Sequence, residues 1–492
     1  MVPYIPERSP DAKFRTLIVL LDGTGDSIDD DVTNIVMLKD MLCGNDDKQM
    51  VLYLQGIGSK MDDSWQSWTN RMWDQAFASS FPERVITAYK WLAENYKDGD
   101  KICIFGFSRG AYTARVLAGM INGMGLLPME GINHVEKAYD LYDDFADLDD
   151  KDPAKRKHEW HDLEVRWQNF KAEKKCQEVF IEFLGCWDTV NSVGYARAIK
   201  LSFTRTNDIV RTFRHAIALD EHRFKFKQNN WSGPPKEVPD SADRPNSKEP
   251  RCKTNVEEVW FAGCHCDIGG GSVPNGTRPN LAHISLRWMI RECFRMNSSI
   301  LFIEKGVKVI GIDPSSIYPI VKPRPEISSF SSGSSDITVV ERQTWGDYFY
   351  SWVPFTSKPE LKTLLVPTQS EEELDAIDAL APAYDQLTLH PGKWSAMEDL
   401  KLKKWQPKDG GFVEVNEPHE SHGRTIPPHF YSHGGKIKVH RTVQLRMEAK
   451  FKNGKEKGQK YVPLARVGYQ PKYEDKKTFE QSVNEGWIQW VA

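Results

Sequence analysis

A serine between two glycines lies where the chain could hold a nucleophile. Gly106, Ser108 and Gly110 form the pattern G-x-S-x-G, and the apolar residues Ile102 to Phe105 before it are typical of a short buried strand. The residues that follow carry apolar side chains at helical spacing as far as Gly125. Strand, sharp turn and helix around this motif predict a nucleophile elbow, in which the serine is held at strained backbone angles and projects into open space.

The chemistry of such a serine is nucleophilic attack on an ester or amide carbonyl. The backbone N–H of Arg109 begins the predicted helix, so it is placed to receive the oxyanion, and the helix dipole favours the same charge. The plainer alternative is a glycine-rich turn with a solvated serine, which occurs by chance in chains of this length. The flanking strand and helix favour the elbow, because the motif has its chemical meaning only in that context.

A serine nucleophile needs a base and an acid that orients the base, and both have candidates downstream. The apolar run Val179 to Trp187 predicts a strand with Asp188 at its carboxyl end. Val256 to Cys264 predicts another strand, and His265 follows it directly. In open α/β sheets the chemistry gathers at the carboxyl ends of the strands. We therefore expect Ser108, Asp188 and His265 to form one constellation.

Each member of this constellation has an alternative. Asp188 precedes a threonine and could cap a turn, and His265 could be a buried structural histidine. Asp267 is the rival acid, and His215 is the alternative base. The charged residues at 220–223 are expected to form a structural ion pair and packing element.

A metal site is not predicted, although Cys264, Cys266 and Asp267 flank His265. On an extended segment, adjacent side chains point to opposite sides and cannot converge on one ion. No second pair of Cys or His residues follows at the spacing of a zinc site. The predicted reaction requires no metal and no organic cofactor.

The N-terminal strand offers a second oxyanion donor. Arg15 to Leu21 is apolar, and the loop Asp22-Gly23-Thr24-Gly25 follows it at the predicted strand end. A backbone N–H of Gly23 or Thr24 would then lie at the same edge of the sheet as the serine. The alternative is a simple turn from strand to helix.

Six blocks in about the first 300 residues resemble one known family. They read LDGTGDS, YLQGIGS, GFSRGAYTAR, FLGCWDTV, HAIALDEHR and WFAGCHCDIGGG, in order from Leu21 to Gly271. These blocks are similar to the catalytic domain of type VI secretion phospholipase effectors, a family once catalogued as an uncharacterised α/β-hydrolase domain and with many fungal members. The resemblance implies an α/β-hydrolase fold and hydrolysis of phospholipid acyl esters. It also implies Ser108 as nucleophile, Asp188 as acid and His265 as base.

Composition narrows the class of protein. A net charge of -4 over 492 residues provides no basic stripe, so no nucleic-acid partner is expected. No apolar run approaches the roughly 20 residues of a membrane span, and the first ten residues lack the pattern of a signal peptide. A cytoplasmic protein without a transmembrane segment is therefore expected. The eight cysteines lack framework spacing, as is typical of reduced thiols. Oligomeric state does not follow from the sequence.

The predicted organisation is an α/β-hydrolase domain over residues 1–320, with a parallel-rich central sheet, and a C-terminal extension over 321–492. A Pro- and Ser-rich stretch separates the two. In the extension, a helix is expected over 371–380. A strand is expected over 437–447, where apolar residues alternate.

A charged helical insertion is expected over residues 131–175. Its aromatic residues Tyr139, Tyr142, Trp160 and Trp167 could line an acyl pocket beneath a lid, because aromatic side chains supply apolar area at little entropic cost. A helical hairpin packed for stability is the alternative.

Together these features predict a serine carboxylic-ester hydrolase whose substrate, by resemblance, is a lipid ester such as a phospholipid. Because no membrane-binding stripe is evident, an esterase or thioesterase for a soluble acyl compound is an alternative. A second alternative is a non-catalytic scaffold that keeps the fold. The presence of an acid, a base and a nucleophile argues against the scaffold.

Overall fold

The structure is a computed structural model of the 492-residue chain. It describes residues 3–9, 11–23, 32–44, 47–56, 70–144, 153–190, 207–223, 226–231, 252–274, 276–325, 339–340, 367, 369–389, 401–408, 411–418, 421–426, 436–452, 457–468 and 474–492. Side chains are described in these ranges except at 70–79, 153–160, 339–340 and 401–418.

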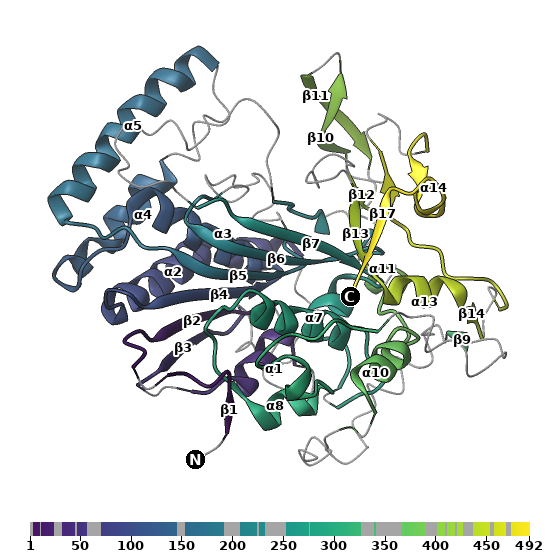
Figure 1. The fold of residues 1–492 in the computed structure, drawn as a ribbon. Coiled ribbons are helices and arrows are strands. Elements are labelled where there is room, and N and C mark those ends of the chain that lie inside the picture. The colour runs from purple at the N-terminus through teal and green to yellow at the C-terminus, as the bar shows by residue number, and fades with distance from the viewer. Residues whose placement is uncertain are drawn as a thin grey trace.

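An eight-stranded sheet forms the centre of the described structure (Figure 1). Every neighbouring pair in it is parallel. The strands lie in the order β3 (Gln49–Leu54), β2 (Thr16–Leu21), β4 (Lys101–Phe107), β5 (Ile181–Trp187), β6 (Val210–Ala218), β7 (Asn255–Phe261), β13 (Ile437–His440) and β17 (Ile488–Val491). The predicted α/β class with a parallel-rich sheet is confirmed.

Helices cover both faces of the sheet, which explains why its strands are apolar throughout. In β2, Leu17, Val19 and Leu21 belong to one buried cluster, while Ile18 and Leu20 belong to another. The first cluster lies under α2 (Asn70–Asn95), α3 (Arg109–Met124), α4 (Val135–Asp143) and α5 (Pro153–Lys174). The second lies under α1 (Asn34–Met41), α7 (Ala282–Arg295) and α8 (Glu304–Val309), on the opposite side in Figure 1.

The order of the strands reverses between β2 and β4. After β2 the chain passes through α1 to the edge strand β3, and then returns through α2 to β4 on the other side of β2. In open α/β sheets, ligands bind outside the carboxyl ends of the strands at such a reversal. The strands β2 and β4 end at Leu21 and Phe107, so the residues at the expected ligand position are Asp22 and Ser108.

Shorter elements complete the described structure. They are β1 (Tyr4–Ile5), η2 (Met129–His134), α6 (His265–Gly269), β8 (Phe302–Ile303), η6 (Pro314–Ser316), β9 (Val339–Val340), α10 (Glu371–Asp378), α11 (Gln386–Leu389), β10 (Lys401–Lys408), β11 (Gly411–Pro418), β12 (Thr425–Ile426), α13 (Thr442–Glu448), β14 (Lys450–Phe451), β15 (Arg466–Val467), β16 (Lys477–Thr478) and α14 (Phe479–Asn484). The helix expected over 371–380 is confirmed as α10, which Ser370 and Glu373 begin with a reciprocal capping box.

The strand expected over 437–447 is wrong in its second half. Only Ile437–His440 is a strand, and α13 begins at Thr442. The apolar residues after Arg441 also fit a helical face, since Val443 and Met447 are four positions apart. A period of two and a period near four cannot be distinguished over so few residues.

The C-terminal residues join the same layers as the N-terminal ones. Both β13 and β17 extend the central sheet beyond β7. On the face that carries α7, Arg287 pairs with Asp375 and Asp378 of α10 at 2.7 and 2.6 Å. We therefore propose one layered unit in place of the expected division at residue 320.

The helical insertion packs on the far end of α3. The ring of Trp167 lies 3.1 Å from the point where a Cβ on Gly123 would stand, and its Nε1 donates to the carbonyl of Leu141 at 2.7 Å. Tyr139 and Tyr142 are buried in the same cluster, and the side chain of Trp160 lies outside the described residues.

This packing favours the hairpin over the lid. Gly123 is separated from Ser108 by the length of α3, about 22 Å at ~1.5 Å per residue. Trp167, Tyr139 and Tyr142 therefore serve the core that holds α3 against α4 and α5.

Replacing Trp167 with alanine should destabilise the protein by about 3–5 kcal/mol, because the cavity beside Gly123 would remain unfilled. Val165 of the same helix is 45% exposed, so Val165→Ala is the matched control and should change stability by no more than about 0.5 kcal/mol. Urea unfolding measures both. Equal stability of Trp167→Ala and Val165→Ala would mean that the hairpin is not part of the core.

Candidate active site

Ser108 lies in a strained turn between β4 and α3. Its φ of 58° and ψ of -122° are rare for a residue with a side chain. The Ser108 N–H donates to the carbonyl of Trp187 at the end of β5, at 2.9 Å. The strand, turn and helix that the sequence predicts around Ser108 are present as β4, the turn at Ser108 and α3.

Both glycines of the motif are required by close backbone approach. A Cβ on Gly106 would lie 2.5 Å from the carbonyl oxygen of Gly110. A Cβ on Gly110 would lie 2.2 Å from the carbonyl oxygen of Leu21 and 2.5 Å from that of Asp22. The first turn of α3 therefore rests directly on the end of β2, and only glycine fits there.

His265 is the partner of the serine. Its Nε2 lies 2.7 Å from Ser108 Oγ. The imidazole is buried and stacks on Phe107, while Phe226 contacts it edge-on, each with 4.8 Å between ring centroids. The His265 N–H donates to Glu221 Oε2 at 3.2 Å. Two rings and a backbone hydrogen bond thus fix the orientation of the imidazole.

The strand before His265 is shorter than the sequence predicts. β7 ends at Phe261, and His265 begins the short helix α6. Between them Gly263 has a φ of 106°, and a Cβ on it would lie 2.5 Å from the Cβ of Asp267. Residues 264–267 therefore do not form the extended segment that the sequence predicts. Within the described residues, no group of three His, Cys, Asp or Glu side chains is arranged to hold a metal ion.

Asp188 completes the chain of hydrogen bonds. Its Oδ2 accepts from His265 Nδ1 at 2.6 Å, and its Oδ1 accepts from the Ala218 N–H at 2.9 Å. Because Nδ1 donates to Asp188, Nε2 is the acceptor that faces the serine hydroxyl. The structure thus brings Ser108, His265 and Asp188 together in that order.

A guanidinium that the sequence did not suggest also holds Asp188. Arg424 donates from Nη1 to Oδ1 at 2.5 Å and from Nη2 to Oδ2 at 2.9 Å. Burial by itself would raise the pKa of the Asp188 carboxyl, but the Arg424 charge and the hydrogen bond from His265 hold that pKa well below its usual range. Asp188 is therefore an anion at neutral pH.

The two rivals from the sequence have other partners. His215 Nδ1 lies 2.8 Å from Glu258 Oε1, and its Nε2 accepts from the Thr189 N–H at 3.0 Å. Asp267 accepts from the backbone N–H groups of Cys264 and Tyr384 at 2.8 and 2.9 Å, and burial raises its pKa to about 7. His215 thus supports the residue after Asp188, and Asp267 supports the turn before His265.

Opposite charges balance around the imidazole. Asp188 and Glu221 are negative, Arg424 and Arg223 are positive, and Arg223 Nη2 pairs with Glu221 Oε2 at 2.8 Å. The ion pair expected at 220–223 is thus present. Burial lowers the pKa of His265, although the hydrogen bond to Asp188 opposes this effect. The imidazole is therefore neutral at neutral pH and able to accept a proton.

The sequence predicts that the backbone N–H groups of Arg109 and of Gly23 or Thr24 receive the oxyanion. Arg109 is the first residue of α3, so its N–H lies at the positive end of the helix. The N–H of Gly23 donates to Asp22 Oδ1 at 2.7 Å, and Asp22 also accepts from the hydroxyls of Thr33 and Tyr53. Thr24 lies outside the described residues.

Arg424 and Phe226 are the site residues that sequence reasoning missed. Arg424 is 236 positions from Asp188 and Phe226 is 39 positions from His265, and neither belongs to a motif. Both approach the site through tertiary packing, so no spacing could have identified them.

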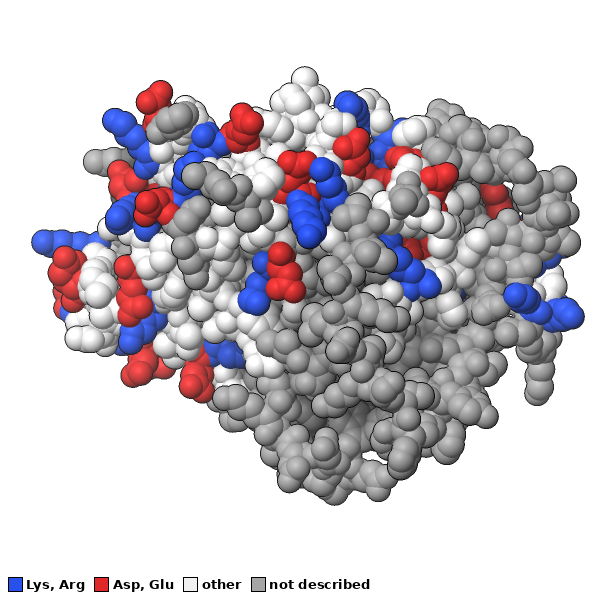
Figure 2. Space-filling model, turned by 90° about the horizontal axis from the view of Figure 1, so that it is seen from below, with Lys and Arg blue, Asp and Glu red and all other residues white. Residues whose placement is uncertain are grey.

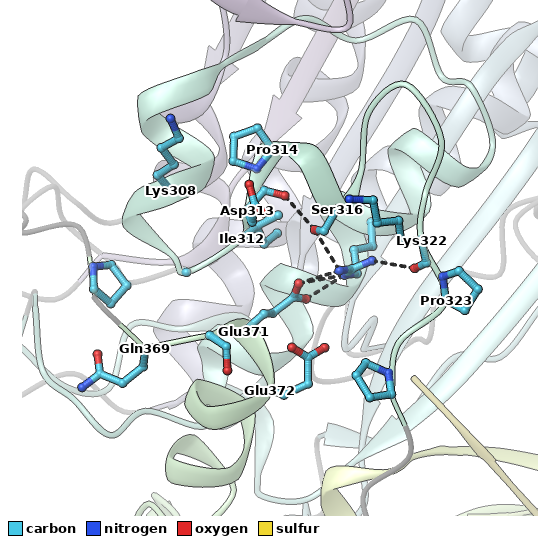
Figure 3. A pocket seen from close by; sticks show the side chains of 15 residues that line it. Lys308, Ile312, Asp313, Pro314, Ser316, Lys322, Pro323, Gln369, Glu371 and Glu372 are labelled. Carbon is cyan, nitrogen blue, oxygen red and sulfur yellow. Dashed lines mark hydrogen bonds and ion pairs between the residues drawn. The ribbon is translucent and has the colours of Figure 1, made fainter. Parts of the chain in front are cut away.

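A separate hollow lies at the contact between α7 and α10 (Figure 3). Arg291 and Glu371, which both line it, are already paired. Arg291 donates to Glu371 at 2.7 Å and to Ser316 Oγ at 3.1 Å. The residues that line this hollow come from α7, from the segment between Lys308 and Pro325, and from the residues around the start of α10, so it is distinct from the site around Ser108.

Charges of both signs are interspersed over the described surface visible in Figure 2. In the described part of the chain, no helix is both long and apolar enough to cross a membrane.

The parallel sheet, the elbow and the strand-end site define an α/β-hydrolase fold. The family model described as "T6SS, Phospholipase effector Tle1-like, catalytic domain" matches residues 15–292, more than half of the chain. The chain belongs to this family, as the six sequence blocks predicted.

One curated protein and two solved structures are similar to parts of this chain. "Uncharacterized protein YEL023C" of Saccharomyces cerevisiae is 34% identical over 230 residues, which cover 44% of this chain and 32% of the yeast protein. The match thus spans about a third of the yeast protein's length. A crystal structure of an uncharacterized protein from Pseudomonas aeruginosa aligns with a TM-score of 0.34 and 15% identity, over 63% of this chain and 49% of that one. The Tle1 effector bound to the VgrG spike aligns with a TM-score of 0.28 and 16% identity, over 54% and 52%.

Gly110→Ala should destabilise the protein by at least about 3 kcal/mol, because the added methyl would meet two backbone carbonyls that cannot rotate away. Gly44 is exposed and has no atom within 4 Å of its would-be Cβ, so Gly44→Ala is the matched control. Urea unfolding compares the two. A folded Gly110→Ala protein with the stability of the control would contradict the close approach of α3 to β2.

Proposed function

We propose that this protein is a serine hydrolase of carboxylic esters, and that its substrates are acyl esters of lipids. The observation that carries the proposal is the relay of short hydrogen bonds, 2.7 Å between Ser108 Oγ and His265 Nε2 and 2.6 Å between His265 Nδ1 and Asp188 Oδ2. Membership of a family of phospholipase effectors supports the lipid ester.

In the first half of the reaction, Ser108 Oγ attacks the acyl carbonyl while His265 Nε2 takes the hydroxyl proton. The carbonyl oxygen becomes an oxyanion and His265 becomes an imidazolium. Asp188, held as an anion, stabilises that imidazolium and keeps Nδ1 protonated. His265 then gives its proton to the alcohol that leaves, and the acyl group remains on Ser108.

In the second half, water replaces the alcohol. His265 takes a proton from the water, whose oxygen attacks the acyl-serine carbonyl, and then returns that proton to Ser108 Oγ as the carboxylic acid leaves. The chain's own side chains supply every proton transfer in both halves.

The oxyanion would be received at the N-terminal end of α3, where the backbone N–H of Arg109 and the helix dipole favour negative charge. The N–H of Gly23 could be a second donor only if it gave up its hydrogen bond to the Asp22 carboxylate and donated to the substrate oxygen instead. Thr24 is the other candidate carried over from the sequence.

The substrate class is tested with an ester panel. The wild-type protein is given p-nitrophenyl esters of increasing chain length and vesicles of phosphatidylcholine, with Ser108→Ala as the blank. We expect release of fatty acid from the phospholipid. Hydrolysis confined to short soluble esters would instead support the soluble esterase, and would leave the serine mechanism intact.

A fluorophosphonate probe should label the native protein at Ser108, since only an activated serine reacts well with such probes. Ser108→Ala should not be labelled, whereas Ser315→Ala, which changes an exposed serine, should be labelled at the wild-type rate. Mass spectrometry of the labelled peptide identifies the site. Labelling that survives Ser108→Ala would show that another residue is the nucleophile.

Asp188→Asn should lower kcat by at least about 10³-fold, because an amide cannot both accept from Nδ1 and stabilise the imidazolium. Asp267→Asn should lower kcat by less than about 10-fold, since its carboxylate is bonded to backbone N–H groups. Steady-state kinetics on the best ester compares the two, with circular dichroism to check folding. If Asp267→Asn is the more damaging of two folded variants, Asp267 is the orienting acid.

A further inference from the structure

The acid of the proposed relay is held by a residue from outside the family domain. The family model ends at residue 292, whereas Arg424 comes from the C-terminal part of the chain, immediately before β12. Arg424 is buried, and its guanidinium forms a two-pronged pair with the Asp188 carboxylate, with distances of 2.5 and 2.9 Å.

We propose that Arg424 is a positioning residue that holds the Asp188 carboxylate in the orientation that His265 requires. The proposal rests on the proposed function, in which Asp188 is the acid of the relay. It implies that the working unit of this protein extends at least from the β2 strand to Arg424.

The hydrogen bonds of Asp188 leave it one orientation. Its two oxygens accept from Arg424 Nη1, Arg424 Nη2, the Ala218 N–H and His265 Nδ1. A carboxylate has about four lone-pair positions, so all of them are used. Turning the carboxylate toward any other group would break both prongs of the Arg424 pair and the Ala218 bond at once.

Arg424 is itself held in place on its other side. Its Nη2 donates to the carbonyl of Phe226 at 2.6 Å, and its Nη1 donates to the carbonyl of Ala218 at 3.1 Å. The Arg424 carbonyl accepts from the Arg466 N–H at 2.9 Å, which links it to β15. The guanidinium of Arg424 therefore links β6 to the segment after it, and the backbone of Arg424 joins both to the small sheet of β12, β15 and β16.

The charge of Arg424 also affects the base. Among the described residues, the charged groups nearest to this hydrogen-bond chain are Asp188 at the end of β5, Glu221 and Arg223 after β6, and Arg424. Asp267, on the same helix as His265, is directed at two backbone N–H groups. Removing the Arg424 charge would leave Asp188 uncompensated, and the imidazolium form of His265 would become more favourable.

The test compares the full-length wild type with Arg424→Gln and Arg424→Lys. Gln removes both the charge and the fork, whereas Lys keeps the charge and loses the fork. The matched control is Arg287→Gln, because Arg287 is also buried and pairs with two carboxylates, Asp375 and Asp378, instead of with Asp188. Two quantities are measured: the rate of fluorophosphonate labelling at Ser108, and the pKa of the His265 imidazole by NMR of ¹³C-labelled histidine.

We expect wild-type His265 to titrate below the ordinary histidine value of about 6.5. In Arg424→Gln, labelling should slow by at least about 10-fold and the His265 pKa should rise by at least about 0.5. In Arg424→Lys, labelling should also slow by about 10-fold, but the pKa should change by less than about 0.3. Arg287→Gln should lower the melting temperature and leave both quantities unchanged.

If Arg424 only stabilises the fold, the result is different. Arg424→Gln would then be less stable, but the His265 pKa and the labelling rate per folded molecule would match the wild type. That result overturns the proposal. If Arg424→Gln does not fold, Arg424→Lys decides: a folded Arg424→Lys protein that is labelled at the wild-type rate also overturns the proposal. Failure of the proposed function appears separately, as a wild-type protein that neither labels at Ser108 nor hydrolyses esters. The NMR titration still tests the hold of Arg424 on the Asp188–His265 pair in that case.

Discussion

The structure depends on the close approach of three backbones at one edge of the sheet. The first turn of α3 lies on the carbonyls that end β2, and the turn before it donates from the Ser108 N–H to the last carbonyl of β5. Only glycine at position 110 permits this approach, since a Cβ would lie 2.2 Å from the Leu21 oxygen. The strain at Ser108 is therefore held by packing on both sides, which leaves the hydroxyl directed at His265.

Around this turn the chain buries charges in compensating pairs. An isolated carboxylate in the interior would become neutral, because burial penalises its charged form. Asp188 remains an anion since Arg424 and His265 both contact it, and Glu221 is compensated by Arg223. The local charges sum to zero while the imidazole is neutral. In the proposed relay, this balance keeps the imidazole of His265 neutral and able to accept a proton.

Two regions lie outside the core strands of the sheet: the helical insertion and the C-terminal part of the chain. The charged insertion contributes aromatic residues to the core at the end of α3 that is distant from Ser108. The C-terminal part, which lacks any motif, adds β13 and β17 to the sheet and places Arg424 on Asp188. The charge and aromatic content of a segment indicate which of its side chains are buried and which are exposed. They do not indicate where the segment packs, because that depends on which faces of the core are still uncovered.

The local sequence pattern alone was sufficient to predict the elements that carry Ser108 and Asp188. The turn at Ser108 and the strand before Asp188 followed from apolar runs and glycine spacing, because backbone geometry and side-chain period act over a few residues. The same patterns extended the strand before His265 as far as Cys264 and extended β13 through α13, since short apolar runs fit either period. Only the tertiary structure decided that Asp188, not Asp267, meets His265, and that Arg424 joins them. Those contacts join residues 77 and 236 positions apart, and they exist only once the sheet has brought the strand ends together.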